Sequence, residues 1–137
     1  MKKLLFILAT LLLISSFLSA QSNYKVVFDI TSKDTVDHKN VIRWINTILA
    51  SDADANLEVV FYGQSLDMVV KNKSILSEKI TTLAANKNVT FNVCAVAMKA
   101  HNIDKSELLP GVQIVPDGIY EIISKQRDNW GYIKVSH

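Results

Sequence analysis

The stretch LEVVFYG, residues 57–63, combines β-branched, apolar and aromatic side chains and ends at a glycine. This composition favours a β-strand, and the glycine favours a tight turn directly after it. A run of the same kind precedes it at Tyr24–Ile30, and another follows at Val89–Val93. The segment between the first two runs predicts an amphipathic helix, because its apolar residues recur at helical spacing: Val41, Ile42, Ile45, Ile48 and Leu49.

The alternation of strand and helix continues to the end of the sequence. Pro110-Gly111 marks a loop before the fourth strand. Strands that alternate with helices of this length indicate right-handed βαβ crossovers and a mainly parallel sheet. We therefore expect a three-layer α/β/α sandwich with five strands. The remaining predicted elements are helices from about Ile75 to Ala85, over Cys94–Ala100 and from Asp117 to about Asp128, and strands over Val112–Val115 and Tyr132–Val135.

The first 20 residues are typical of an export signal. A basic start at Met1–Lys3 precedes an apolar run at Leu4–Ile14, and small residues then lead to Ala20. A retained membrane anchor is the alternative, but a bilayer span needs about 20 apolar residues, and serines interrupt this run earlier. We expect cleavage near Ala20 and a mature domain over residues 21–137, exported to the periplasm or secreted, without stable membrane insertion.

Composition excludes several classes of protein. The chain has 15 Lys plus Arg and 13 Asp plus Glu, and removing Lys2 and Lys3 leaves the mature part near neutrality. This balance argues against a nucleic-acid binder, which needs to neutralise several phosphates. An apolar content of 49% excludes a disordered chain. One cysteine makes no internal disulfide, and with three scattered histidines it gives no zinc-site spacing, so we expect no metal and no organic cofactor.

In an open α/β sheet, ligands bind beyond the carboxyl ends of the strands. This rule selects a cysteine that follows the third strand. A helix start favours the thiolate form of Cys94, although His101 lies too far along the helix to act as its base. The alternative is that Cys94 is a small buried packing residue. The other residues that the rule selects as a pocket are Asp29, Gly63, Gln64, Ser65, Pro116, Asp117 and Gly118.

Other polar and aromatic residues are less informative. Asp29 and Asp117 form a carboxylate pair across the strand ends or cap the helices that follow, and capping is the stronger interpretation for Asp117. His38 and His101 are expected to be solvated. Trp44 falls on the polar side of its predicted helix, where an exposed tryptophan would mark an interface.

The order of these segments resembles the DsrE/DsrF-like family of small sulfur-metabolism proteins, nearest to an uncharacterised exported branch. The matching positions are Gly63, Cys94, Gly118, Gly131 and Tyr132. The resemblance implies the α/β sandwich and assembly into homo-oligomers, commonly trimers or hexamers. In the sulfur-relay members, a cysteine at the position of Cys94 carries a persulfide to a partner protein. Those members are cytoplasmic, whereas this chain begins like an exported protein. The segments are VVFDI, LEVVFYGQSLDMV, VTFNVCAVAMKAHNI and LLPGVQIVPDGIYEIISKQRDNWGYIKV.

The sequence leaves three functions open. The first is a sulfur carrier in which Cys94 accepts sulfur from a donor protein or passes it to an acceptor. The second is a non-catalytic, oligomeric binding module that uses the strand-end cleft, with Cys94 only structural. The third is a redox sensor at Cys94, which ranks last because no resolving thiol is present. Exposure of Cys94 distinguishes the second function from the other two.

Overall fold

The computed structural model describes residues 24–136, so the predicted export signal at residues 1–20 lies outside the described part. The five predicted strands are confirmed, and the predicted helices occur with shifted ends. A buried 3-10 helix after the second strand was not predicted. The elements are β1 (Lys25–Ile30), α2 (Thr35–Ser51), β2 (Asn56–Phe61), η2 (Ser65–Val69), α3 (Ser77–Ala84), β3 (Val89–Cys94), α4 (Ala95–Ala100), η3 (Lys105–Glu107), β4 (Gln113–Val115), α5 (Gly118–Arg127) and β5 (Gly131–Val135).

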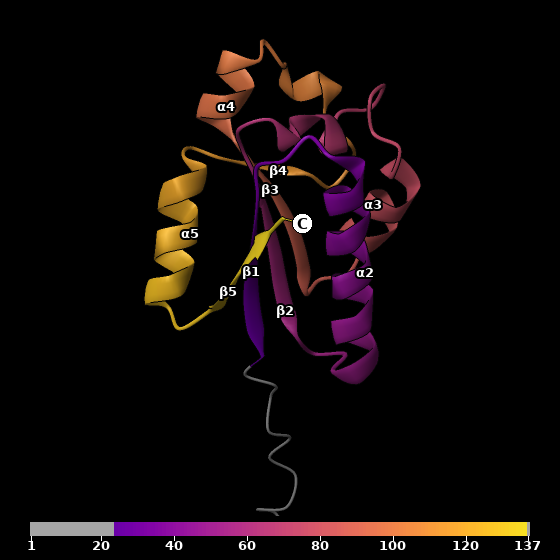
Figure 1. Ribbon diagram of the computed structural model, residues 1–137, viewed down its shortest axis with the longest axis vertical. Helices are drawn as coiled ribbons and strands as arrows, with labels where there is room; N and C mark the ends of the chain where they lie inside the picture. Colours follow the sequence, from indigo (N-terminus) through magenta and orange to yellow (C-terminus); the bar gives the residue numbers. More distant parts are fainter. Residues whose placement is uncertain (1–23, 137) are drawn as a thin grey trace, which may run out of the picture.

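The strands form one five-stranded sheet in the order β4-β3-β2-β1-β5, and all neighbouring pairs are parallel. The first strand therefore lies between the second and the last. The carboxyl ends of the strands meet at one edge, where α4 and the 3-10 helices are also found (Figure 1). This edge is the one at which ligands bind in open α/β sheets.

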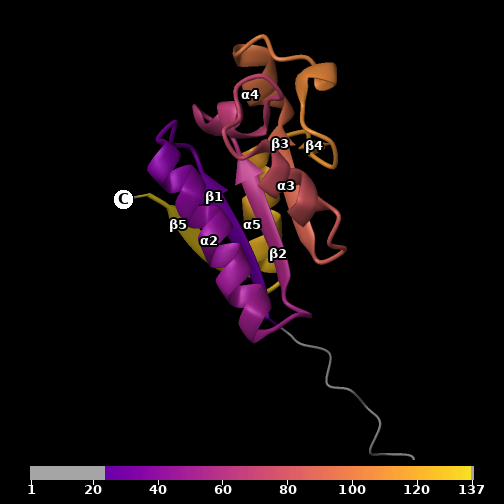
Figure 2. The same ribbon diagram turned by 90° about the vertical axis from the view of Figure 1, so that its right-hand side faces the viewer.

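Helices cover the two faces of the sheet unequally. Helices α2 and α3 lie on one face and α5 lies alone on the other, which confirms the three-layer sandwich (Figures 1 and 2). The main core lies under α2 and α3. Phe28, Phe61 and Phe91 are completely buried in it. The face under α5 has a much smaller apolar cluster, formed by Val27, Val60 and Ile122.

Helix α2 begins where the sequence provides a cap. The Asp34 carboxylate accepts a hydrogen bond from the Val36 amide at 2.7 Å, which satisfies one of the unpaired donors of the first turn. Two predictions for this helix are wrong. Trp44 is half-buried and stacks on Phe28, with 6.4 Å between ring centroids. His38 is buried against the core rather than solvated, because it lies on the same face of the helix as the apolar residues.

Helix α5 has an apolar outer surface. Ile119, Ile122 and Ile123 recur at helical spacing along it, but only Ile122 is buried. The other two are exposed together with Tyr120, at 60%, 58% and 66% for Ile119, Ile123 and Tyr120. No helix among residues 24–136 combines the length and apolar character needed to cross a bilayer.

Candidate functional site

Cys94 lies at the junction of β3 and α4, as the sequence predicted. It is the last residue of the strand and the residue before the helix. Its side chain is only 6% exposed. Helix α4 has just six residues, so it adds little dipole to the site. Of the two placements left open by the sequence, the structure shows the buried one.

The start of α5 covers Cys94. Gly118, the first residue of that helix, lies so close that a side chain there would place its Cβ 3.1 Å from the Cβ of Cys94 and 3.6 Å from the Cβ of Tyr62. Asp117 accepts a hydrogen bond from the Tyr120 amide at 2.9 Å, so it caps α5. The capping interpretation is therefore the correct one for Asp117. Glycine at position 118 lets the helix approach the thiol closely.

A buried carboxylate organises the same face of the sheet. Asp29, which is 5% exposed, accepts a hydrogen bond from the Tyr132 hydroxyl at 2.6 Å and from the Lys134 ammonium at 2.9 Å. Lys134 also donates to the Thr31 hydroxyl at 3.0 Å. Parallel register explains this group, because Asp29 is paired with Lys134 and Val27 with Tyr132. Asp29 therefore holds residues of β5 and does not form a carboxylate pair with Asp117.

Tyr62 connects this cluster to the cysteine. Burial raises the pKa of Tyr62, and its hydrogen bond to Asp29, the negative charge of Asp29 and the neighbouring Tyr132 and Cys94 raise it further. The Lys134 ammonium lies 5.6 Å from the centre of the Tyr62 ring. For Tyr132, the hydrogen bond to Asp29 is the main cause that raises its pKa to about 12. Both phenols therefore stay protonated at neutral pH and act as hydrogen-bond donors.

The remaining predicted pocket residues shape the turn after β2. Gly63 has a φ of 61°, a left-handed conformation that favours glycine. Ser65 is completely buried, and its hydroxyl lies 2.8 Å from the Ile30 carbonyl and 2.9 Å from the Tyr62 carbonyl. Gln64 is exposed, and its backbone amide donates to the Thr31 carbonyl at 3.0 Å. These three residues fix the ends of β1 and β2.

Tyr62 and Lys134 were not predicted as site residues, and Tyr132 entered only as one of the positions that carry the family resemblance. The spacing of two residues in the fifth strand could have identified Tyr132 and Lys134 as neighbours. Side chains two positions apart lie on the same face of a strand, so Tyr132 and Lys134 had to share a face. Which strand they would meet depended on the sheet order, which the sequence did not reveal. Residues 24–136 contain no group of three or more His, Cys, Asp or Glu side chains that could hold a metal ion.

A family model described as DsrE/DsrF-like matches residues 25–135. The chain belongs to the DsrE/DsrF-like family. The resemblance found in the sequence is thus confirmed, and it covers the whole described fold. The five-stranded parallel sheet agrees with membership of this family. Three of the positions that carry the resemblance, Cys94, Gly118 and Tyr132, belong to the site described above.

Solved structures resemble this DsrE/DsrF-like chain over most of its length. The protein of unknown function MTH1491 from Methanobacterium thermoautotrophicum has a TM-score of 0.77 and 28% identity, and the match covers 82% of this chain and 99% of that one. The ychN protein from E. coli has a TM-score of 0.69 and 14% identity, over 81% and 98% of the two chains. The protein of unknown function BT1422 from Bacteroides thetaiotaomicron has a TM-score of 0.65 and 11% identity, over 85% and 99%. No curated protein matches the chain.

Proposed function

We propose that this protein takes part in sulfur relay, with Cys94 as the residue that accepts sulfur as a persulfide. Membership of the DsrE/DsrF-like family suggests a role of this type. The observation that carries the assignment to Cys94 is its place at the carboxyl edge of the sheet, against Gly118 and beside the hydrogen-bonded group of Asp29, Tyr62 and Tyr132.

The proposed reaction transfers one sulfur atom without net oxidation or reduction. The Cys94 thiolate attacks the outer sulfur of a donor persulfide, R–S–SH. A new S–S bond forms at Cys94 while the donor S–S bond breaks, and the donor leaves as a thiolate that takes up the proton lost from Cys94. The products are the donor thiol and Cys94 persulfide. No metal and no organic cofactor takes part.

The neighbouring residues suit this chemistry. The Lys134 ammonium is 41% exposed at the edge of the site, and its positive charge stabilises the negative charge that sulfur carries during transfer. The two phenol hydroxyls donate to Asp29 and hold this carboxylate in place beside the site. Since Cys94 is buried, transfer of sulfur to it requires the first turn of α5, at Gly118, to move away from the thiol. The direct test is intact-mass measurement of the protein after incubation with a small organic persulfide, which should add one sulfur atom at Cys94.

A second candidate function is favoured by the burial of Cys94. A thiol that is 6% exposed packs well as a small apolar residue. In that case the protein is a non-catalytic oligomeric binding module, and the strand-end group recognises its ligand without covalent chemistry. A native protein that gains no sulfur from the donor would support this alternative.

We also propose that this protein is exported from the cytoplasm. The basic start, apolar run and small residues before Ala20 predict a signal peptide. We expect the exported protein to begin at or near Gln21 and to remain in solution without detergent. N-terminal sequencing of protein recovered from outside the cytoplasm checks this result. Recovery of a membrane-bound chain that retains Leu4–Ile14 would contradict it.

The protein is also expected to be a homo-oligomer, as its family membership suggests, with a trimer or hexamer as the expected form. The apolar outer surface of α5 is a suitable contact, and Ile119 is 60% exposed on it. We expect Ile119→Glu to shift sedimentation toward the monomer. Ile75→Glu is the matched control, because Ile75 is equally exposed but lies outside α5. A wild-type protein that sediments only as a monomer at micromolar concentration would contradict this prediction.

A further inference from the structure

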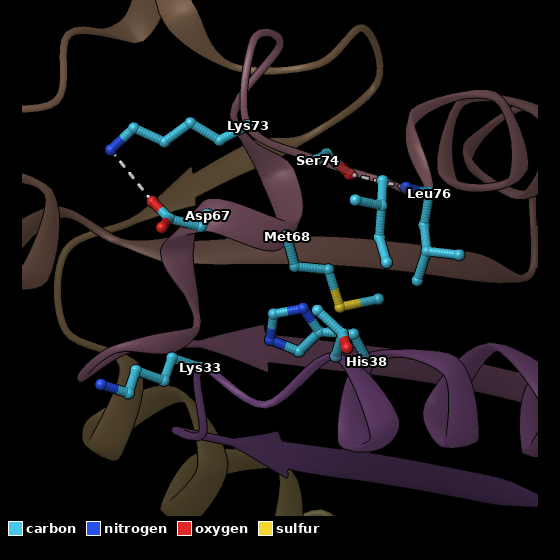
Figure 3. Close-up of a pocket in the computed structure, with 9 residues that line it drawn as sticks. Lys33, His38, Asp67, Met68, Lys73, Ser74 and Leu76 are labelled. Atoms are coloured by element: carbon cyan, nitrogen blue, oxygen red, sulfur yellow. Dashed lines mark hydrogen bonds and ion pairs between the residues drawn. The ribbon is translucent and has the colours of Figure 1, made fainter.

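An apolar groove lies between the second half of α2 and β5, the strand at one edge of the sheet. Its volume is about 330 Å³. Figure 2 shows β5 on the outer side of β1, next to α2. A hollow near the start of α2 differs, because polar side chains line much of it, including the ion-paired Lys73 and Asp67 (Figure 3). Of the two, the groove beside β5 is the one that suits an apolar side chain. The residues that line this groove are Trp44, Thr47, Ile48 and Ile133.

The backbone of β5 has a side that no strand pairs within residues 24–136, since β5 neighbours only β1 there. The direction of the groups on β1 identifies this side. The Tyr62 amide donates to the Ile30 carbonyl, so the even-numbered residues of β1 direct their backbone groups to β2. Backbone groups alternate in direction along a strand, so the odd-numbered residues of β1 bond to β5.

The register then shows which groups of β5 point outward. Asp29 is the partner of Lys134 and Val27 is the partner of Tyr132. In a parallel pair, a residue bonds to the residues on either side of its partner. The first, third and fifth residues of β5 therefore bond to β1. Tyr132 and Lys134 direct their N–H and C=O groups outward, where a further strand would pair them.

The features that protect an edge strand are missing from β5. Proteins prevent pairing at such edges with prolines, bulges or charged side chains. The strand, GYIKV, contains no proline, and its register with β1 is unbroken over all five residues. Its one charged residue, Lys134, is paired with Asp29 at 2.9 Å. A strand added at this edge would therefore bury no unpaired charge.

We propose that β5 pairs antiparallel with β5 of a second copy of this chain, about a two-fold axis at Ile133. The strand is complementary to itself in this register. Tyr132 lies opposite the partner's Lys134, so the two lysines do not face each other, and the outward backbone groups of both strands are paired. Ile133 faces the partner's Ile133 in a non-hydrogen-bonded pair, in which side chains are close. The partner's Ile133 thereby closes the open side of the apolar groove.

This contact differs from the one proposed for the outer surface of α5. A two-fold contact uses the same surface on both copies and closes after two chains, whereas a trimer needs two different surfaces. Two trimers joined through β5 make a hexamer. The hexamer rests on the homo-oligomer proposed above, but pairing of β5 does not depend on sulfur transfer. A protein that pairs through β5 and gains no sulfur would contradict the relay function and leave this contact intact.

The experiment places a disulfide on the proposed axis. Ile133→Cys is made in the Cys94→Ala protein, so that the chain carries one cysteine. In a non-hydrogen-bonded antiparallel pair the Cα atoms are ~4.5 Å apart, a separation that a disulfide spans. Mild oxidation should link most of the protein into dimers that a reducing agent separates. Ile75→Cys in the same background is the matched control, because Ile75 is 60% exposed and lies outside β5. No cross-link at position 133, or equal cross-linking of both variants, would overturn the proposal.

A second variant leaves the strand unchanged, in case Ile133→Cys does not fold. Thr47 is exposed on α2 and lines the groove, so Thr47→Glu places a charge where the partner's Ile133 would lie. We expect this variant to sediment with half the mass of the wild-type assembly. Thr81→Glu is its matched control, because Thr81 is an exposed threonine of α3. Equal sedimentation of the two variants would overturn the contact.

Discussion

Cys94→Ser is expected to abolish sulfur loading completely. The reaction requires a thiolate, and a serine hydroxyl at the same position neither attacks a persulfide nor holds a sulfur atom. After incubation with a small organic persulfide, the wild-type protein should gain one sulfur atom by intact-mass measurement and the variant none. Reduction of the loaded wild-type protein with a thiol should remove the added sulfur, since a persulfide is exchangeable.

Cys94→Ala distinguishes the loss of the reacting thiol from a loss of stability caused by a buried hydroxyl. Alanine removes the thiol without burying a hydroxyl, whereas serine leaves a polar group in a site that is 6% exposed, at a cost of about 1–3 kcal/mol. Both variants should fail to load sulfur, and the alanine variant should fold with nearly normal stability. A wild-type protein that resists loading and whose thiol is alkylated only after denaturation would eliminate the carrier function and leave the binding module.

Lys125→Met is expected to cause the largest loss of stability. Lys125 forms an ion pair with Glu58 at 2.7 Å, and Glu58 is 2% exposed beneath α5. The other carboxylate oxygen of Glu58, Oε1, has no hydrogen-bond partner within the described residues. Removing one partner of a buried pair costs about 3–5 kcal/mol, because the remaining charge stays buried. Urea denaturation measures the free energy of unfolding of both proteins.

The loss should depend on pH in a defined direction. Burial raises the pKa of Glu58 above its ordinary value of 4.5, and Lys125 opposes this increase. Without Lys125 the pKa rises further, so the folded variant holds a proton that the unfolded chain releases. A carboxyl with a raised pKa in the folded state favours folding below its unfolded pKa and loses that contribution as pH rises. The deficit should therefore be larger at mildly alkaline pH than at mildly acidic pH.

A double variant supplies the control. Glu58→Leu combined with Lys125→Met replaces the pair by apolar side chains and should recover most of the lost stability. It should also remove the pH dependence, because no buried carboxyl remains at position 58. If the double variant is as unstable as Lys125→Met, the loss comes from packing around α5, and the assignment to the buried charge is wrong.

Local sequence signals predicted the architecture but not the contacts within the site. The strands were visible as β-branched and aromatic runs, and Asp117 was recognisable as a cap. The hydrogen bonds from Tyr132 and Lys134 to Asp29 were not, because they depend on the last strand pairing with the first. The sequence order of strands does not determine their order in a sheet.

Two further errors have a common physical cause. His38 was expected to be solvated and Trp44 to lie on the polar side of its helix, although each packs through its ring. His38 satisfies one nitrogen at the Ser32 carbonyl and buries the rest, and Trp44 places its ring on Phe28. Amphipathic side chains bury their apolar parts and keep a polar atom bonded or wet. A helical pattern built from aliphatic residues alone does not detect them.

The pairing of β1 with β5 has a consequence for how the chain folds. Asp29 and Tyr132 are 103 positions apart, so their hydrogen bond closes almost the entire described chain into a loop. Contacts of such long range raise the contact order, and they form slowly because the entropy of loop closure must be lost before they stabilise the fold. The sheet from β1 to β4 is assembled from sequential neighbours, but its last strand arrives only when the chain end is available. A chain truncated before β5 therefore lacks Tyr132 and Lys134, so the polar group beside Cys94 cannot form in it.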